Sequence, residues 1–138
     1  MSGYSIVTRD DAPDFMAQYP GYGEMRFFTE PAEMEQVAFT WRQMPAGTGG
    51  KGSYGHRHTD QEEIYFVISG RLQFKLGDDV VEVGPHTAVR VAADTYRSVH
   101  NEGPEDAELV ICSVKVDDAE AQTEMTPDFW PSDSGEHL

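Results

Sequence analysis

The sequence is poor in cysteine and in long apolar runs, and each shortage excludes a class of protein. Cys112 is the single cysteine, so no disulfide can form within the chain, and its apolar surroundings LVICSV are typical of a buried structural thiol. No run of about 18 apolar residues is present, and the opening MSGYSIVTRDDAPDF lacks a basic stretch followed by an apolar one. We therefore expect neither a membrane span nor a secretory signal, and a cytoplasmic location.

Basic residues are also scarce. The chain has 10 lysines and arginines against 25 acidic residues, a formal net charge of -15. This charge repels nucleic-acid phosphates and anionic lipid headgroups, so we expect neither nucleic acid nor a membrane as a partner. Residues 117–138 contain no lysine or arginine. We expect them to form a solvated acidic tail, anchored by Phe129 and Trp130.

Short alternating segments are what the sequence has in abundance. In VAFTW, residues Val37, Phe39 and Trp41 share one face, which predicts a strand with its aromatic face in the core. RLQFKL repeats the pattern, and the following GDD predicts a turn, so residues 71–83 are expected to form a hairpin. Brief helices are expected only at residues 11–18 and 118–124.

Many short strands, with turn residues every eight to twelve positions, predict an all-β barrel or two-sheet sandwich. A chain of 138 residues is sufficient for one core. We expect an N-terminal arm with strands over residues 1–34 that packs on the barrel, the barrel itself over 35–116, and the acidic tail over 117–138.

The stretch GHRHTDQEE carries the strongest candidate for chemistry. His56 and His58 lie on one face of a strand because side chains alternate with a period of two, and Glu63 begins the next apolar segment. Two imidazoles and one carboxylate suit a divalent transition metal with open coordination positions, such as Fe, Mn, Ni or Zn. Spacing alone is equally consistent with loop histidines that make ordinary hydrogen bonds.

Five residues match a known motif, G-x5-H-x-H-x4-E-x6-G: Gly50, His56, His58, Glu63 and Gly70. The chain therefore resembles the cupin superfamily, over roughly residues 35–116. The resemblance implies a small single-domain cupin, an antiparallel jelly-roll barrel with short flanking helical or irregular termini. It also implies a homodimer, since cupins commonly pair through sheet edges or faces.

The second motif of that family, G-x5-P-x-G-x2-H-x3-N, is eroded. Asn101 keeps its place, but Arg97 stands where the resemblance implies a fourth, histidine ligand; the other replaced positions are His86, Ala92 and Asp94. His100 is close in sequence, yet its strand parity differs from that of Arg97, so it is expected to face away unless a bulge turns it.

Two interpretations of Arg97 stay open. In the first, His56, His58 and Glu63 hold a metal, Arg97 binds an anionic group of the substrate, and Tyr65 offers its hydroxyl. The chain would then be a metal-dependent enzyme that acts on a small organic acid through dioxygenase-like, isomerase or decarboxylase chemistry. In the second, Arg97 pairs with Glu63, and the cavity is a metal-free binding or sensing site.

A third interpretation needs no metal either. In it the protein is a sugar-modifying enzyme that uses His58 as base and Tyr65 as acid, as some cupin-like epimerases do.

Overall fold

The structure is a computed structural model that describes residues 3–133. It contains two 3₁₀ helices, η1 (Arg9–Asp11) and η2 (Phe15–Gln18), and ten strands: β1 (Glu24–Phe27), β2 (Val37–Met44), β3 (Gly55–His58), β4 (Glu63–Ser69), β5 (Leu72–Leu76), β6 (Asp79–Val83), β7 (Thr87–Val91), β8 (Arg97–His100), β9 (Ala107–Val114) and β10 (Thr123–Thr126). Within residues 3–133, none of the helices has the length and apolar character needed to cross a membrane.

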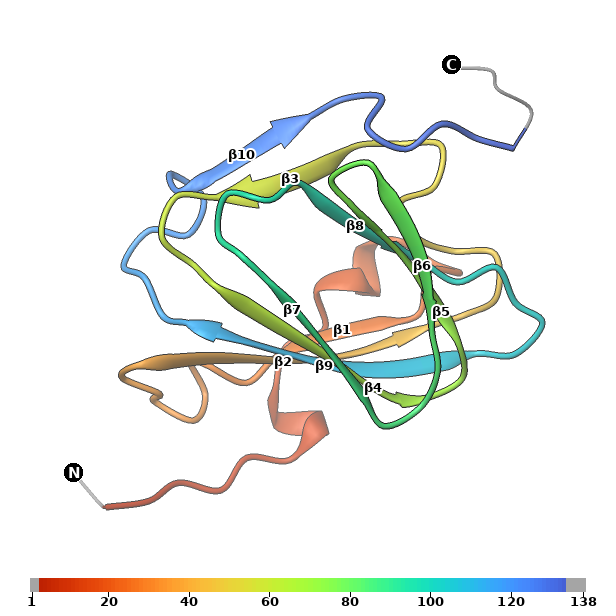
Figure 1. The fold of residues 1–138 in the computed structure, drawn as a ribbon. Coiled ribbons are helices and arrows are strands. Elements are labelled where there is room, and N and C mark those ends of the chain that lie inside the picture. Colours follow the sequence, from red (N-terminus) through yellow and green to blue (C-terminus); the bar gives the residue numbers. More distant parts are fainter. Residues whose placement is uncertain (1–2, 134–138) are drawn as a thin grey trace.

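The strands form two antiparallel sheets that face each other (Figure 1). One has the order β1-β2-β9-β4-β7 and the other β10-β3-β8-β5-β6. The predicted hairpin is present as β5 and β6, paired from Leu72–Val83 to Leu76–Asp79. The architecture confirms the expected all-β jelly roll with short irregular termini.

The core lies between the two sheets. Phe74 and Leu72 of β5 meet Val67 of β4 and Leu109 of β9, and all four side chains are fully buried. Because these residues alternate with less buried ones, each strand presents one apolar face to the interior. Tyr65 and Val99 belong to this core and also line the cavity described below.

The orientation of β2 differs from the prediction. Its partner strands place Thr40 and Arg42 on the inner face, whereas Phe39 and Trp41 lie on the outer face beside Val110. Both aromatic residues are only partly buried, against the N-terminal segment. The apolar face of β2 therefore packs outside the barrel, because the N-terminal arm covers it there, and the prediction that it joins the core is wrong.

The C-terminal segment is more ordered than predicted. Residues 119–122 form turns in place of the expected helix, and β10 then pairs with β3 from Thr123–His58 to Thr126–Gly55. Trp130 is 3% exposed, and its ring lies 5.9 Å from that of His100. Trp130 anchors the segment as expected. The prediction that the whole segment is a solvated tail is wrong, because β10 belongs to the sheet.

Candidate metal centre

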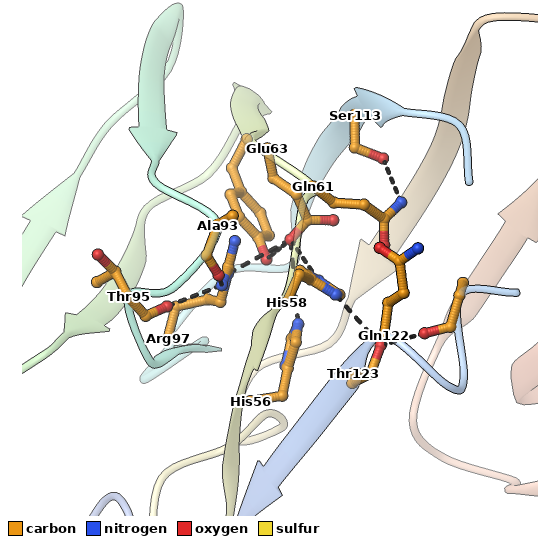
Figure 2. Close-up of polar contacts among 12 residues, drawn as sticks. His56, His58, Gln61, Glu63, Ala93, Thr95, Arg97, Ser113, Gln122 and Thr123 are labelled. Carbon is orange, nitrogen blue, oxygen red and sulfur yellow. Dashed lines mark hydrogen bonds and ion pairs between the residues drawn. The ribbon is translucent and has the colours of Figure 1, made fainter.

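His56, His58 and Glu63 converge on one point between the two sheets (Figure 2). The histidines come from β3 of one sheet and Glu63 from the start of β4 in the other. Their ligand atoms all lie within 4.8 Å of one another. Oε1 of Glu63 is 3.3 Å from Nε2 of His58 and 4.0 Å from Nε2 of His56.

The tautomer of His58 is determined by Thr123 of β10. The Thr123 hydroxyl donates its one proton to the Ala119 carbonyl, at 2.6 Å, so its oxygen accepts from Nδ1–H of His58, at 3.2 Å. Nε2 of the same ring points toward Glu63. This Nε2 is buried and has no hydrogen-bond partner among the described residues.

Glu63 is held as a carboxylate. Burial by itself raises the pKa of the Glu63 carboxyl, but its contacts with His58, Arg97 and Tyr65 outweigh burial and hold the pKa below its usual value. The Tyr65 hydroxyl donates to Oε1 at 2.9 Å. Burial also raises the pKa of Tyr65, so this phenol keeps its proton and remains a donor.

His56 is neutral at physiological pH. Burial lowers its pKa to about 4, although the Glu63 charge acts in the opposite direction. Its ring lies 4.9 Å from that of His58, at an angle of 73°. The His56 imidazole is therefore available as a neutral nitrogen ligand.

Arg97 lies behind Glu63 and does not line the cavity. It is 1% exposed; its Nη1 donates to the carbonyls of Ala93, at 3.1 Å, and Thr95, at 2.7 Å. Its Nε is 3.4 Å from Oε1 of Glu63 but makes no hydrogen bond. The arginine thus pairs electrostatically with Glu63, while its role as a substrate anchor stays a prediction.

A cavity of about 480 Å³ opens beside the three ligand residues. His56, His58, Glu63 and Tyr65 line one side of it, and Arg42 of β2 lies among the remaining lining residues. Arg42 was missed by sequence reasoning because the aromatic residues of β2 were assigned to the inner face. Thr123 was missed because it lies in the segment predicted to be solvated.

The other two histidines near the second motif lie elsewhere. His100 faces Trp130 and Glu102 on the outside of the barrel, in agreement with its strand parity. His86 has a φ of 63°, the left-handed conformation that glycine adopts most easily. The glycine of the family motif is therefore lost at residue 86, but the backbone shape is kept.

The residues present fit a divalent transition metal. Bonds from zinc to nitrogen or oxygen are about 2.1 Å long, so neighbouring ligand atoms of a tetrahedral site lie roughly 3.4 Å apart. Glu63 and His58 are already near that separation, with no hydrogen bond between them. A divalent cation between them could bind both atoms.

Comparisons with known proteins agree with this geometry. The family model described as a cupin domain matches residues 42–114. No curated protein sequence matches the chain significantly.

Several solved structures share the fold. The polyketide cyclase RemF from Streptomyces resistomycificus has a TM-score of 0.69 and 17% identity, over 95% of this chain and 89% of that chain. A cupin protein from Bacteroides fragilis has a TM-score of 0.67 and 18% identity, over 87% and 91%. A predicted oxalate decarboxylase from Thermotoga maritima has a TM-score of 0.64 and 19% identity, over 80% and 99%.

At these identities the structural neighbours show the fold alone, whereas the family match covers more than half of the chain. Together with the two-sheet barrel and the histidine-glutamate cluster, that match establishes that the chain belongs to the cupin domain family.

Proposed function

We propose that the protein is a metal-dependent cupin enzyme that acts on a small organic acid. His56, His58 and Glu63 are the metal ligands, and the cavity beside them receives the substrate. The observation that carries the proposal is Nε2 of His58, which is buried, has no hydrogen-bond partner among residues 3–133 and lies 3.3 Å from the Glu63 carboxylate.

The surrounding residues prepare these ligands. Thr123 fixes His58 in the tautomer that leaves Nε2 free, and Tyr65 orients the Glu63 carboxylate by a hydrogen bond. Arg97 opposes part of the negative charge of Glu63, because its guanidinium is adjacent to Oε1. A divalent metal at this site supplies Lewis acidity or, in the case of iron, oxygen activation.

An acid substrate is supported by charge. A divalent ion together with Glu63, Arg97 and Arg42 leaves a net positive charge around the cavity, which an anionic ligand would balance. One neighbour in fold is described as a predicted oxalate decarboxylase, which agrees with an acid substrate. Dioxygenase-like chemistry is our first choice of reaction, ahead of isomerisation or decarboxylation, since a two-histidine, one-carboxylate set is typical of oxygen-activating iron.

Elemental analysis tests the metal site. The untagged protein, purified without chelator, is expected to contain close to one equivalent of Fe, Mn, Ni or Zn. The double variant His56→Ala/His58→Ala should lose this metal, while His100→Ala should retain it, because His100 faces away from the site. Absence of metal even after anaerobic reconstitution with each of the four ions would reject the proposal.

A metal-free binding site is the second candidate, and the pair of Arg97 with Glu63 favours it. In that case His58 is protonated and pairs with the Glu63 carboxylate, and no metal ion lies between them. Binding of a small acid by the metal-free protein, without metal uptake under any condition, would support this candidate over the first.

A further inference from the structure

Arg42 is a partly buried cation with no ion-pair partner among residues 3–133. It extends from β2 into the cavity, and its Nε has no exposed surface and no hydrogen-bond acceptor within residues 3–133. No ion pair of Arg42 is found in the described part of the chain. A buried charge without compensation is costly, so a partner from outside the chain is the simplest reason to keep one.

The guanidinium remains charged at physiological pH. Burial lowers the pKa of Arg42, while the nearby phenols of Tyr65 and Tyr54 act in the opposite direction. Arginine starts from so high a pKa that it stays protonated in proteins. Its planar set of N–H donors matches the two oxygens of a carboxylate.

Other basic residues near the barrel are already paired. Arg57 contacts Glu124, Lys51 contacts Glu102, and Arg90 contacts Glu62. None of these three lines the cavity. Arg42 is thus the basic side chain placed to meet a ligand there.

Aromatic side chains surround the mouth of the same cavity and are exposed to between 39% and 52%: Phe15, Tyr19, Tyr22, Phe27 and Tyr54. The ring of Phe15 lies 6.2 Å from that of Tyr19 and 5.9 Å from that of Phe27, which forms a continuous aromatic surface. Packing of a further aromatic ring against this surface is energetically favourable.

The aromatic surface is held in place over the cavity. Asp14 accepts hydrogen bonds from the backbone N–H groups of Met16, at 2.9 Å, and Met25, at 3.0 Å. These bonds fix η2, which carries Phe15, to the first residues of β1. The rings therefore need little ordering when a ligand binds.

We propose that this cavity binds an aromatic carboxylate, whose carboxylate pairs with Arg42 and whose ring packs against the aromatic surface at the mouth. The inference rests on the proposed function for the chemistry that follows binding, since it names the substrate class of that site. Binding itself depends on Arg42 and the aromatic residues and does not require metal.

Calorimetric titration with three aromatic acids tests the inference: benzoate, phenylacetate and cinnamate. Each is compared with its uncharged amide, and acetate serves as the probe without a ring. At least one aromatic acid is expected to bind the wild-type protein at least about tenfold more tightly than its amide and than acetate, because hydrogen bonds to charged groups are the stronger ones. Failure of all three acids to bind, or equal binding of acid and amide, would overturn the inference.

Variants assign the effect to Arg42. Arg42→Gln should weaken binding of the acid by about tenfold or more, whereas binding of the amide should change little. Arg90→Gln is the matched control, since Arg90 is exposed and lies on the outer face, and it should bind as the wild type does. Thermal melting of Arg42→Gln should show an unchanged or raised Tm, because a buried unpaired charge is removed. Equal affinity of wild type and Arg42→Gln for the acid would overturn the inference.

Titrations of the metal-stripped and the metal-loaded protein separate the two proposals. Acid binding that depends on Arg42 in a protein that takes up no metal would reject the metal-dependent function alone. Metal uptake by a protein that binds none of the three acids would reject the aromatic-carboxylate inference alone.

Discussion

Arg97 is the residue at which this site departs most from the family motif. It occupies the place of a fourth histidine ligand, is almost fully buried, and lies next to Glu63. Its cation is close enough to the ligand set to weaken metal binding by charge repulsion. The three remaining ligands are expected to hold metal less tightly than four would.

The Arg97→His variant should therefore bind metal about tenfold more tightly or better, since it removes a positive charge and adds a nitrogen ligand; each 1.4 kcal/mol is about a factor of ten. Competition with a chromophoric chelator gives the affinity, and circular dichroism shows whether the variant folds. Arg90→His, which alters an exposed arginine, serves as the control. An affinity equal to that of wild type would mean that residue 97 does not face the metal position.

Thr123 controls the orientation of one ligand without touching the metal position. The Thr123→Val variant keeps the shape of the side chain but loses the oxygen that accepts from Nδ1–H of His58. Loss of such a partner typically lowers metal affinity by about 10- to 100-fold. Thr123→Ser keeps the hydroxyl and should therefore retain most of the metal affinity. A general disturbance of β10 would not distinguish serine from valine in this way. Metal titration of the three proteins gives the answer, and identical affinities would contradict this role.

Burial of His56 makes the metal-free protein sensitive to acid. Its pKa is lowered to about 4 in the folded state from about 6.5 in the unfolded state, so the unfolded chain binds more protons between these values. The free energy of unfolding should fall as pH decreases through this window, by up to roughly 3 kcal/mol.

Urea denaturation of the metal-free protein between pH 7 and pH 4 measures this contribution. The His56→Asn variant should show a smaller decrease in stability over the same range, since asparagine does not titrate. Parallel curves for the two proteins would show that His56 contributes nothing to the acid sensitivity.

Among the elements, β10 connects the C-terminal segment to the site. It pairs with β3, carries Thr123, and is followed by the buried Trp130. Backbone hydrogen bonds join Trp130 to Gly52 and Ser53, in the loop that precedes β3. The segment that resembles a simple acidic tail therefore supports the strand that carries both histidines.

Removal of the Trp130 side chain should lower both the stability of the protein and its affinity for metal. Trp130→Ala is expected to lower the free energy of unfolding by about 3–5 kcal/mol, the usual range for a buried tryptophan. Met125→Ala is the matched control, because Met125 lies on β10 but is 53% exposed. Urea denaturation compares the two, and a loss in Trp130→Ala no larger than in the control would show that the anchor is not needed.

At the scale of the whole molecule, the outer face of the β1-β2-β9-β4-β7 sheet is unusually apolar. Cross-strand neighbours form two rows on it, Trp41 with Val110 and Phe66, and Phe39 with Cys112 and Ile64. Ile64 and Phe66 are 44% and 37% exposed. The N-terminal arm covers Phe39 and Trp41, and we propose that the remaining apolar part of this face, with Ile64 and Phe66, is covered by a second copy of the chain in a homodimer.

Light scattering after size-exclusion chromatography should therefore give twice the mass of one chain. The double variant Ile64→Lys/Phe66→Glu should shift the protein toward the monomer, because it places charges in the apolar rows. Val80→Glu alters a residue of the other sheet that is 53% exposed and should leave the mass unchanged. A wild-type protein with the mass of a single chain would reject the dimer.

The sequence by itself determined the strand-rich fold, the β5–β6 hairpin and the three metal-ligand candidates. Alternation with a period of two is a local property, and the spacing of His56, His58 and Glu63 lies within one short stretch that the strand geometry orients directly. His86, at the position where the motif has glycine, has a positive φ, which glycine adopts most easily.

Only the tertiary structure decided which face of each strand is inside and which distant residues meet the ligands. The alternation in β2 is equally consistent with either orientation, and packing of the N-terminal arm on Phe39 and Trp41 turned Arg42 inward. Thr123 reaches His58 only because β10 pairs with β3 across 65 residues of sequence. Periodicity in one strand cannot specify such contacts, since they depend on where the rest of the chain packs.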